Sequence, residues 1–510
     1  MLHHHVGIRQ RFTAIVTPAY ALLTKVFFVV DSFTSEPSMP ARLGQGLGFK
    51  LSRSDLDSGL AKRSVYFIVD VMKKIIRKLL PEALLLQYHR LVAHVAAWRY
   101  GKPSREMVII GVTGTKGKTS TSNYIWSVLM AGGYKTGIIS TANIRVGDQE
   151  RVNEYHMTMP GRFELQRLLR EMADAGCRYC LVETTSEGIK QYRHTGVAYD
   201  IGVFTNLTPE HLSSHGGSFD NYKHTKGKMF AALAKKRKVI EGEAVPKLSV
   251  VNGDSEHADY FLGFDADWQR TFGVDSSGLD YKASRISSSP DGVTFKVGRR
   301  KYSLSIQGEF NVYNALPALV IGEHLQLDDK QIKSGLSNLS TIPGRMEPID
   351  EGQDYSVLVD YAHEKESMQR VLDAGYAMKP SSDNNIIILL GAEGGGRDKT
   401  KRPIMGKQVG EQADYVVVSN VDPYEDDPSE IVRDISDAAS EAGKQEGKDL
   451  FSIEDRREGI SKALSLAKSG DVVLITGKGS EQSIIVDGVS SAWDDRQVTK
   501  EELKKLLKSS

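Results

Sequence analysis

Residues 111–119, GVTGTKGKT, combine glycine, lysine and threonine in a pattern that could bind the phosphates of a nucleoside triphosphate. An apolar run at 108–110 precedes them and a helix-forming stretch follows, which is the strand–loop–helix context of a phosphate loop. The glycines let successive backbone N–H groups turn toward an anion. Lys118 could reach the β- and γ-phosphates, and the Thr119 hydroxyl could bind Mg²⁺. The spacing of the outer glycines is one residue longer than in the general pattern, but the context favours a nucleotide site over an incidental turn.

Polar side chains follow two further predicted strands, at residues 179–182 and 200–204. The first strand ends in Glu183, and the second is followed by Glu210 and His211. Because parallel strands end at one edge of a sheet, we expect these groups to lie beside the phosphate loop. Carboxylate and imidazole groups are reasonable ligands for the Mg²⁺ that accompanies ATP. A helix-capping or packing role is the alternative for His211.

The overall composition excludes several classes of protein. A net charge of +1 gives no global polyanion-binding character, and no basic patch with interleaved aromatic residues predicts nucleic-acid binding. Only two cysteines occur, Cys177 and Cys180, which argues against a disulfide-built secreted protein and indicates a reducing compartment. Their C-x-x-C spacing lacks the second pair that a structural zinc site needs. A redox role remains open beside the simpler interpretation of two half-buried strand residues.

At 510 residues the chain is long enough for about three domains. Residues 105–343 alternate apolar strands with amphipathic helices, which predicts an α/β domain with a doubly wound, mostly parallel sheet. Alternating stretches around 270–307 predict a β-rich insertion in it. Residues 344–510 repeat the alternation and predict a separate, Rossmann-like α/β domain. Two such domains joined by a hinge suit an enzyme that closes around ATP and a second substrate.

The first hundred residues differ from both α/β domains. Residues 1–60 are expected to form a poorly defined leader. Residues 61–104 predict a basic, amphipathic helical segment, with apolar residues at helical spacing on both sides of Pro81. Residues 64–100 fit either a helical hairpin packed on the next domain or an element lying on an anionic membrane surface. They contain no uncharged run of about 18 residues, so a membrane-spanning helix is not expected.

Eight ordered motifs between about residues 105 and 500 resemble those of the Mur ligases. In chain order they read GVTGTKGKT (111–119), VETTSEG (182–188), FTNLTPEHL (204–212), YKHTKGKMF (222–230), PGRME (343–347), VDYAH (359–363), GGGRDKTKRPIMG (394–406) and ITGKGSE (475–481). The glycine spacing of the first motif is that of the family's own phosphate loop. The sequence is most similar to the MurE-type enzymes, which add the third amino acid to UDP-N-acetylmuramoyl-L-Ala-D-Glu.

The resemblance implies an ATP-dependent ligase of peptidoglycan synthesis that uses Mg²⁺, with two ions expected. It assigns ATP binding to Gly114, Thr115, Lys116, Gly117, Lys118, Thr119, Ser120, Asn206, Arg345, Asp360 and His363. It assigns metal binding to Thr119, Glu183, His211 and Lys226, and catalysis to Lys118, Lys226 and His211. Lys226 matches the lysine that Mur ligases carbamylate, which would make it an anionic ligand. A plain phosphate contact is the alternative for Lys226.

The partners implied by the resemblance are a muramoyl peptide and a free amino acid. The muramoyl peptide would contact Thr158, Thr185, Gln191 and Arg193, and the amino acid would contact Asp422, Tyr424, Gly477 and Glu481. In the implied reaction, the substrate carboxylate attacks the γ-phosphorus to give an acyl phosphate and ADP, and the amine then displaces phosphate. We expect a monomer in the cytoplasm, with peripheral contact at the inner face of the membrane through residues 64–100 as an open alternative.

Three features depart from the family pattern. Residues 1–104 do not resemble the domain that grips UDP in Mur ligases, which leaves both a UDP-linked and a lipid-linked substrate open. The D-N-P-R motif of diaminopimelate-adding enzymes reads VDPY at 421–424, and Tyr424 cannot clamp a carboxylate as arginine does. Acidic residues at 425–427 favour a cationic side chain, so we expect lysine or ornithine rather than diaminopimelate. The usual G-K-G-H-E reads GKGSE, in which Glu481 could bind the amino group.

Two other functions remain open at this point. A folylpolyglutamate synthase-like enzyme, or another amide ligase of the superfamily, would also lack the UDP-binding domain. A non-catalytic partner of cell-wall enzymes would keep the fold and only bind nucleotide. A scaffold has no need for the joint presence of Lys118, Glu183, His211, Lys226 and Arg345, which argues against the second alternative.

Overall fold

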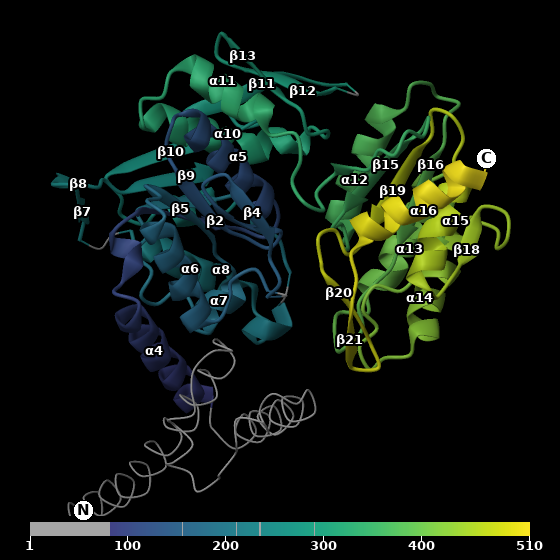
Figure 1. Ribbon diagram of the computed structural model, residues 1–510, viewed down its shortest axis with the longest axis horizontal. Coiled ribbons are helices and arrows are strands. Elements are labelled where there is room, and N and C mark those ends of the chain that lie inside the picture. The colour runs from purple at the N-terminus through teal and green to yellow at the C-terminus, as the bar shows by residue number, and fades with distance from the viewer. Residues whose placement is uncertain (1–81, 156, 211, 234–235, 290, 510) are drawn as a thin grey trace, which may run out of the picture.

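The computed structural model describes residues 82–509, except 156, 211, 234–235 and 290. Figure 1 shows two α/β lobes side by side, an N-terminal lobe in purple to teal and a C-terminal lobe in green to yellow. The predicted leader, the first part of the basic helical segment and His211 lie outside the described residues. The two lobes confirm the predicted α/β fold class, with a phosphate-loop domain followed by a Rossmann-like one.

The N-terminal lobe is built on one large sheet. Its described strands number eleven and follow the order β13-β12-β11-β10-β9-β6-β1-β5-β2-β3-β4. The middle strands run parallel, namely β10 (Trp268–Gly273), β9 (Leu248–Asn252), β6 (Ile201–Phe204), β1 (Val108–Thr113), β5 (Tyr179–Glu183) and β2 (Thr136–Ile139). The carboxyl ends of β1, β5 and β6 therefore meet at the edge from which the phosphate loop emerges.

Further strands extend this sheet at both edges and pair antiparallel with one another. They are β3 (Asn143–Val146) and β4 (Gln149–Val152) on one side, and β11 (Tyr281–Ser289), β12 (Gly292–Val297) and β13 (Arg300–Leu304) on the other. The predicted β-rich insertion is thus a continuation of the central sheet, because β11 first pairs in parallel with β10 through Phe272 and Gly273. A separate two-stranded ribbon is formed by β7 (Val239–Ile240) and β8 (Glu243–Ala244).

The alternation of side chains along β1 explains why helices cover both faces. Val108, Ile110 and Val112 point into one core, which contains α5 (Lys118–Ala131), α10 (Phe310–His324) and α11 (Asp329–Asn338). Ile109 points into the other core, beneath α6 (Arg162–Asp174), α7 (Ser186–Lys190), α8 (Phe219–Ala231) and α9 (Ala258–Leu262). A continuous apolar run is what a parallel strand buried on both faces requires. Two short 3₁₀ helices, η2 (Pro103–Arg105) and η3 (Leu212–His215), complete the lobe.

Helix α4 (Glu82–Arg99) packs against α6. Its buried face includes Ala93 and Ala97, whereas Leu84, Leu91 and Trp98 are exposed at seven-residue spacing. No helix among the described residues is long and apolar enough to cross a membrane. The membrane contact through residues 64–100 stays a prediction, because most of its basic half lies outside the described residues.

The C-terminal lobe has a second sheet, with described strands in the order β14-β15-β19-β16-β17-β18. These are β14 (Glu347–Pro348), β15 (Ser356–Asp360), β19 (Val472–Thr476), β16 (Ile386–Leu390), β17 (Tyr415–Val418) and β18 (Leu450–Ser452). One face is covered by α12 (Lys365–Met378), α13 (Lys401–Gln412) and α14 (Pro428–Glu441), and the other by α15 (Arg456–Leu466) and α16 (Asp495–Ser509). A hairpin of β20 (Ser483–Val486) and β21 (Val489–Ala492) lies outside the sheet.

A buried ion pair joins α15 to α16. Arg456 donates two hydrogen bonds to Asp495, of 2.8 and 2.6 Å, and both side chains are fully buried. The same guanidinium donates to the carbonyls of Asn420 and Thr476, which follow β17 and end β19. Through these bonds Arg456 holds Asp495, the first residue of α16, against the chain beyond β17 and the end of β19.

We predict that Asp495→Ala lowers the free energy of unfolding by about 3–5 kcal/mol, because it leaves the Arg456 charge buried without its carboxylate. Urea denaturation followed by circular dichroism measures this change. Glu501→Ala is the matched control on the same helix, since it removes a largely exposed pair with Arg457 and should change stability little. Equal losses in the two variants would contradict the assignment of a structural role to the buried pair.

Candidate active site

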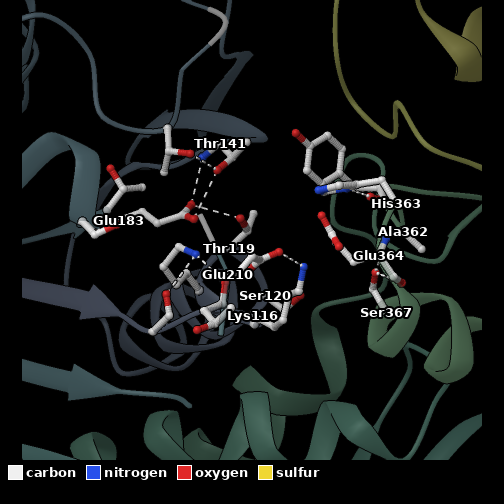
Figure 2. Close-up of a pocket in the computed structure, with 18 of the residues that line it drawn as sticks. Lys116, Thr119, Ser120, Thr141, Glu183, Glu210, Ala362, His363, Glu364 and Ser367 are labelled. Atoms are coloured by element: carbon white, nitrogen blue, oxygen red, sulfur yellow. Dashed lines mark hydrogen bonds and ion pairs between the residues drawn. The ribbon is translucent and has the colours of Figure 1, made fainter. Parts of the chain in front are cut away.

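A cavity of about 1020 Å³ lies between the two lobes. Figure 2 shows residues of the phosphate loop and Glu183 on one side of it, and His363 and Glu364 on the other. Of the predicted ATP-binding residues, all except Asn206 line this cavity. Nucleotide binding between two lobes is therefore consistent with the geometry, although the individual assignments stay predictions.

The phosphate loop adopts backbone angles that need glycine, and its neighbours hold it in place. Gly114 has φ +151° and Gly117 has φ +81°, a region that favours glycine. The Asn206 backbone oxygen accepts a hydrogen bond of 2.9 Å from the N–H of Thr115. The Asn206 side chain accepts from the N–H of Lys116 at 2.9 Å and donates to its carbonyl at 3.1 Å. Asn206 thus supports the loop backbone, and its contact with ATP stays a prediction.

Two lysines converge on one carbonyl oxygen of this loop. Lys118, the first residue of α5, donates to the carbonyls of Thr115 at 2.8 Å and Gly114 at 3.3 Å. Lys226 reaches the Gly114 carbonyl from α8 at 2.7 Å and is almost fully buried. Burial lowers the pKa of Lys118, and burial together with the charge of Lys118 holds the pKa of Lys226 well below its usual value.

Glu183 supplies a buried carboxylate beside the loop, at the end of β5. One of its oxygens accepts hydrogen bonds from the Thr119 hydroxyl at 3.0 Å and the Thr141 N–H at 2.9 Å. The other accepts from the Thr141 hydroxyl at 3.1 Å. Carboxylate and hydroxyl oxygens are ligands that Mg²⁺ prefers, so the donor set fits the ion that accompanies ATP. Thr119 and Glu183 are brought together as expected, and His211 lies outside the described residues.

Charged residues of both lobes meet across the mouth of the cavity (Figure 2). Lys116 forms an ion pair of 2.5 Å with Glu210, and Lys401 lies 3.3 Å from Glu364. Ligand atoms of Glu210, His363 and Glu364 lie within 4.8 Å of one another, close enough for a metal ion. Both carboxylates already have a lysine partner, and these ammonium groups disfavour a cation between them. We therefore interpret the cluster as a polar contact between the lobes.

The hinge and the segment after β15 form the C-terminal side of the cavity. The Arg345 guanidinium lies 4.5 Å from the ring centre of Tyr361. Asp360 accepts hydrogen bonds of 2.8 Å from the N–H groups of Met346 and Ala362, so its carboxylate fixes the hinge to β15. Burial lowers the pKa of His363 to about 4, with a further contribution from the charge of Lys116, and its ring is neutral at pH 7.

Of the residues predicted for the muramoyl peptide, Thr158, Thr185 and Arg193 line the cavity. Gln191 does not line it but accepts a hydrogen bond of 2.8 Å from Arg193. The Thr185 hydroxyl accepts from the N–H of Gly188 and caps α7, which is a structural role in its own right. These residues lie together on the N-terminal side, where an acyl substrate could approach the phosphate loop.

The residues predicted for the amino acid lie deeper in the C-terminal lobe. Lys478 is fully buried and forms ion pairs of 2.8 Å with both Asp422 and Glu481. Gly477 follows β19 and donates its N–H to the Asp360 carbonyl at 3.2 Å. Tyr424 has φ +55°. Its ring centre lies 5.3 Å from the Arg397 guanidinium.

The sequence analysis did not assign several residues that line the cavity, namely Tyr361, Glu393, Arg397 and Lys401. Glu210, which was expected beside the phosphate loop, also lines it. Glu393, Arg397 and Lys401 belong to the segment 393–401, which follows β16. The charges of this segment were the available signal, since ligands of open α/β sheets bind at the carboxyl ends of the strands.

The fold and the cavity together define the class of the protein, which is an ATP-dependent ligase that joins an acid to an amino acid. Residues 112–322 match the Mur ligase middle domain. Residues 344–479 match the domain described as Mur ligase, glutamate ligase domain. The chain belongs to the Mur ligase family, whose members use ATP and Mg²⁺.

Similar proteins support this assignment over most of the chain. The UDP-N-acetylmuramyl-tripeptide synthetase of Roseiflexus sp. (strain RS-1) is 35% identical over 422 residues, 81% of this chain and 82% of that protein. The UDP-N-acetylmuramoyl-L-alanyl-D-glutamate--2,6-diaminopimelate ligase of Geobacillus thermodenitrificans is 35% identical over 431 residues, 83% of this chain and 84% of that protein.

Solved structures show the same architecture. A UDP-N-acetylmuramoyl-L-alanyl-D-glutamate--2,6-diaminopimelate ligase superposes with a TM-score of 0.54 at 26% identity, over 79% of each chain. The folylpolyglutamate synthase of Mycobacterium tuberculosis superposes with a TM-score of 0.59 at 18% identity, over 84% of this chain and 99% of that one. The second likeness shows a shared fold only.

We predict that Gly114→Ala weakens ADP binding by about tenfold or more, since its Cβ would lie 2.0 Å from the Thr205 hydroxyl and 2.9 Å from the Asn206 carbonyl. Titration calorimetry with MgADP measures the affinity. Gly161→Ala is the control, because its φ is −55° and its Cβ would meet nothing within 4 Å. Unchanged affinity in Gly114→Ala would show that the loop does not bind nucleotide.

Proposed function

We propose that this protein joins an amino acid to the carboxylate of a muramoyl peptide in peptidoglycan synthesis, through an acyl phosphate, and converts ATP to ADP and phosphate. One observation carries the proposal: the half-buried Lys118, the buried Lys226 and the buried Glu183 lie beside the phosphate loop, in a cavity that Arg345 of the hinge also lines. Phosphoryl transfer needs concentrated positive charge and exact positioning more than covalent help from the protein. The relatives named as tripeptide synthetase and diaminopimelate ligase support the substrate class.

The residues of the cleft fit a two-step acyl activation. An oxygen of the substrate carboxylate bonds to the γ-phosphorus while the bond to the β-phosphate oxygen breaks, so ADP leaves and an acyl phosphate forms. The amine nitrogen then bonds to the acyl carbon, loses a proton, and the bond to the phosphate oxygen breaks. Lys118 and the loop N–H groups would hold the phosphates, and Arg345 would approach them from the hinge.

Mg²⁺ would be held by Thr119 and Glu183, and when bound it offsets the charge of the phosphates. We propose a second ion held partly by a carbamylated Lys226. Carbamylation needs a neutral amine, whose nitrogen bonds to the carbon of CO₂ with release of a proton. Burial and the charge of Lys118 lower the pKa of Lys226, which favours that neutral amine. The resulting anion would also remove the repulsion between the two neighbouring lysines.

The incoming amine would enter from the C-terminal lobe. Glu481 would accept the ammonium group, and Arg397, which lines the cavity, would hold the α-carboxylate. Tyr424 offers no second cation for a distal carboxylate, while Glu425 and Asp426 add negative charge nearby. Lysine or ornithine therefore fits this pocket better than diaminopimelate.

We predict that ADP release depends on an added amine and favours lysine or ornithine over diaminopimelate by about tenfold in kcat/KM, because one uncompensated charge is worth about that factor. A coupled ADP assay with UDP-linked and lipid-linked muramoyl dipeptides measures the preference for the amine and the preference for the carrier of the dipeptide. Reactions without amine give the background rate. A preference for diaminopimelate would contradict the pocket assignment, and ADP release independent of any amine would contradict the ligase function.

We predict that Lys226→Ala lowers kcat by about 100-fold or more, as expected for loss of an electrostatic group at the transferring phosphate. Short-chain carboxylic acids should restore part of the activity, because they can occupy the space of the carbamate. Lys228→Ala is the control, since Lys228 lies two residues further on the same helix and is exposed. Loss of activity without any rescue would leave Lys226 as a phosphate contact and overturn the carbamate.

A further inference from the structure

Tyr361 connects residues on the two sides of the proposed chemistry. It directly follows β15, lines the cavity, and is flanked by Asp360 and Ala362. Its hydroxyl donates a hydrogen bond of 3.1 Å to Glu481. Its ring faces the Arg345 guanidinium, 4.5 Å from the ring centre, on the side of the hinge. One half-buried side chain thus touches a residue proposed for the amine and a residue proposed for ATP.

The hydroxyl completes the hydrogen bonding of Glu481. The second carboxylate oxygen of Glu481 accepts from Lys478 at 2.8 Å, and Lys478 is held by Asp422. Both oxygens therefore have a fixed donor, which sets the direction of their remaining lone pairs. The charge of Glu481 and burial raise the pKa of Tyr361 well above its usual value, so the phenol remains a donor at every working pH.

The ring positions Arg345. A guanidinium over an aromatic face is attracted by the ring's negative face, and the contact also limits the rotamers of the arginine. Gly479 packs closely against both side chains. A Cβ at this position would lie 2.9 Å from the Cβ of Tyr361 and 3.1 Å from Nη1 of Arg345. The His363 ring packs edge-on against Tyr361, with ring centres 4.6 Å apart.

Packing alone does not account for a tyrosine here. The side chain lies at the cavity rather than in the core, and phenylalanine would fill the same volume. Neighbouring residues that only pack along β15, such as Val357 and Val359, are fully buried and apolar. The hydroxyl has one recorded acceptor, the Glu481 carboxylate, among the described residues.

We propose that Tyr361 is a positioning residue that links amine binding to ATP binding. Its hydroxyl aims the Glu481 carboxylate at the incoming ammonium group, and its ring keeps Arg345 directed toward the phosphates. Removing the hydroxyl should weaken only the amine, whereas removing the ring should weaken both ligands. This inference rests on the proposed function, since Glu481 and Arg345 have their roles from it.

The test compares Tyr361→Phe, which keeps the ring, with Tyr361→Leu, which loses the ring and the hydroxyl. We expect Tyr361→Phe to raise KM for the amine by about tenfold and to leave KM for ATP within about twofold, because a hydrogen bond to a charged group is lost. Tyr361→Leu should raise both KM values and weaken MgADP binding in calorimetry. Tyr355→Phe is the matched control, since its hydroxyl donates only to the Leu464 carbonyl at 3.4 Å near the other end of β15.

The outcomes separate this inference from the function on which it rests. An active wild type with an unchanged amine KM in Tyr361→Phe would overturn the role of the hydroxyl. MgADP affinity equal in Tyr361→Leu and the wild type, with both thermal midpoints equal, would overturn the role of the ring. A wild type that releases no ADP with any amine would overturn the proposed function itself. A variant that loses its fold is recognised by its thermal midpoint, and the isosteric phenylalanine variant then decides the role of the hydroxyl through its KM for the amine.

Discussion

The Gly114 carbonyl accepts from the half-buried Lys118 and from the buried Lys226, and the rest of the active site depends on this contact. Burial disfavours the charged form of both lysines, and the charge of Lys118 lowers the pKa of Lys226 further. A polyanion that enters would stabilise the charged forms of both lysines, and this stabilisation would add to its binding energy. The phosphate loop, the Asn206 hydrogen bonds to it and the sheet below it keep the two lysines together.

Much of this arrangement could be predicted from the sequence, because the residues concerned lie next to strands and helices that the apolar pattern identifies. The phosphate loop, Glu183 and the Lys226 helix each follow or begin an element whose apolar pattern is unambiguous, and parallel strands then bring their ends together. The continuation of the sheet into β11–β13 could not be predicted, because it depends on two parallel pairs between β10 and β11 that leave no local pattern. The hydrogen bonds of Asn206 to the Lys116 backbone could not be predicted either, since sequence gives the neighbourhood of a side chain and not its direction, and its contact with ATP stays a prediction.

Contacts between residues far apart in the sequence could not be predicted. Lys116 and Glu210 are separated by 94 residues, and Tyr361 and Glu481 by 120. Motif spacing carries no information on such pairs, because their distance depends on how separate elements of one lobe pack together. The resemblance to the Mur ligases located the motifs, whereas the hydrogen-bond partners of their side chains, such as Lys478 with Asp422 and Glu481, came only from the structure.

The hinge residue Gly344 packs closely against the loop that follows β19 in the C-terminal lobe. A Cβ on Gly344, which has φ +61°, would lie 2.1 Å from the backbone nitrogen of Ser480 and 2.3 Å from the carbonyl carbon of Gly479. The hinge backbone and the loop after β19 therefore touch without a side chain between them. Because of this contact, a rotation of one lobe against the other would move Arg345 and the loop that carries Glu481 together. The amine pocket would then keep its shape while its distance to the phosphate loop changed.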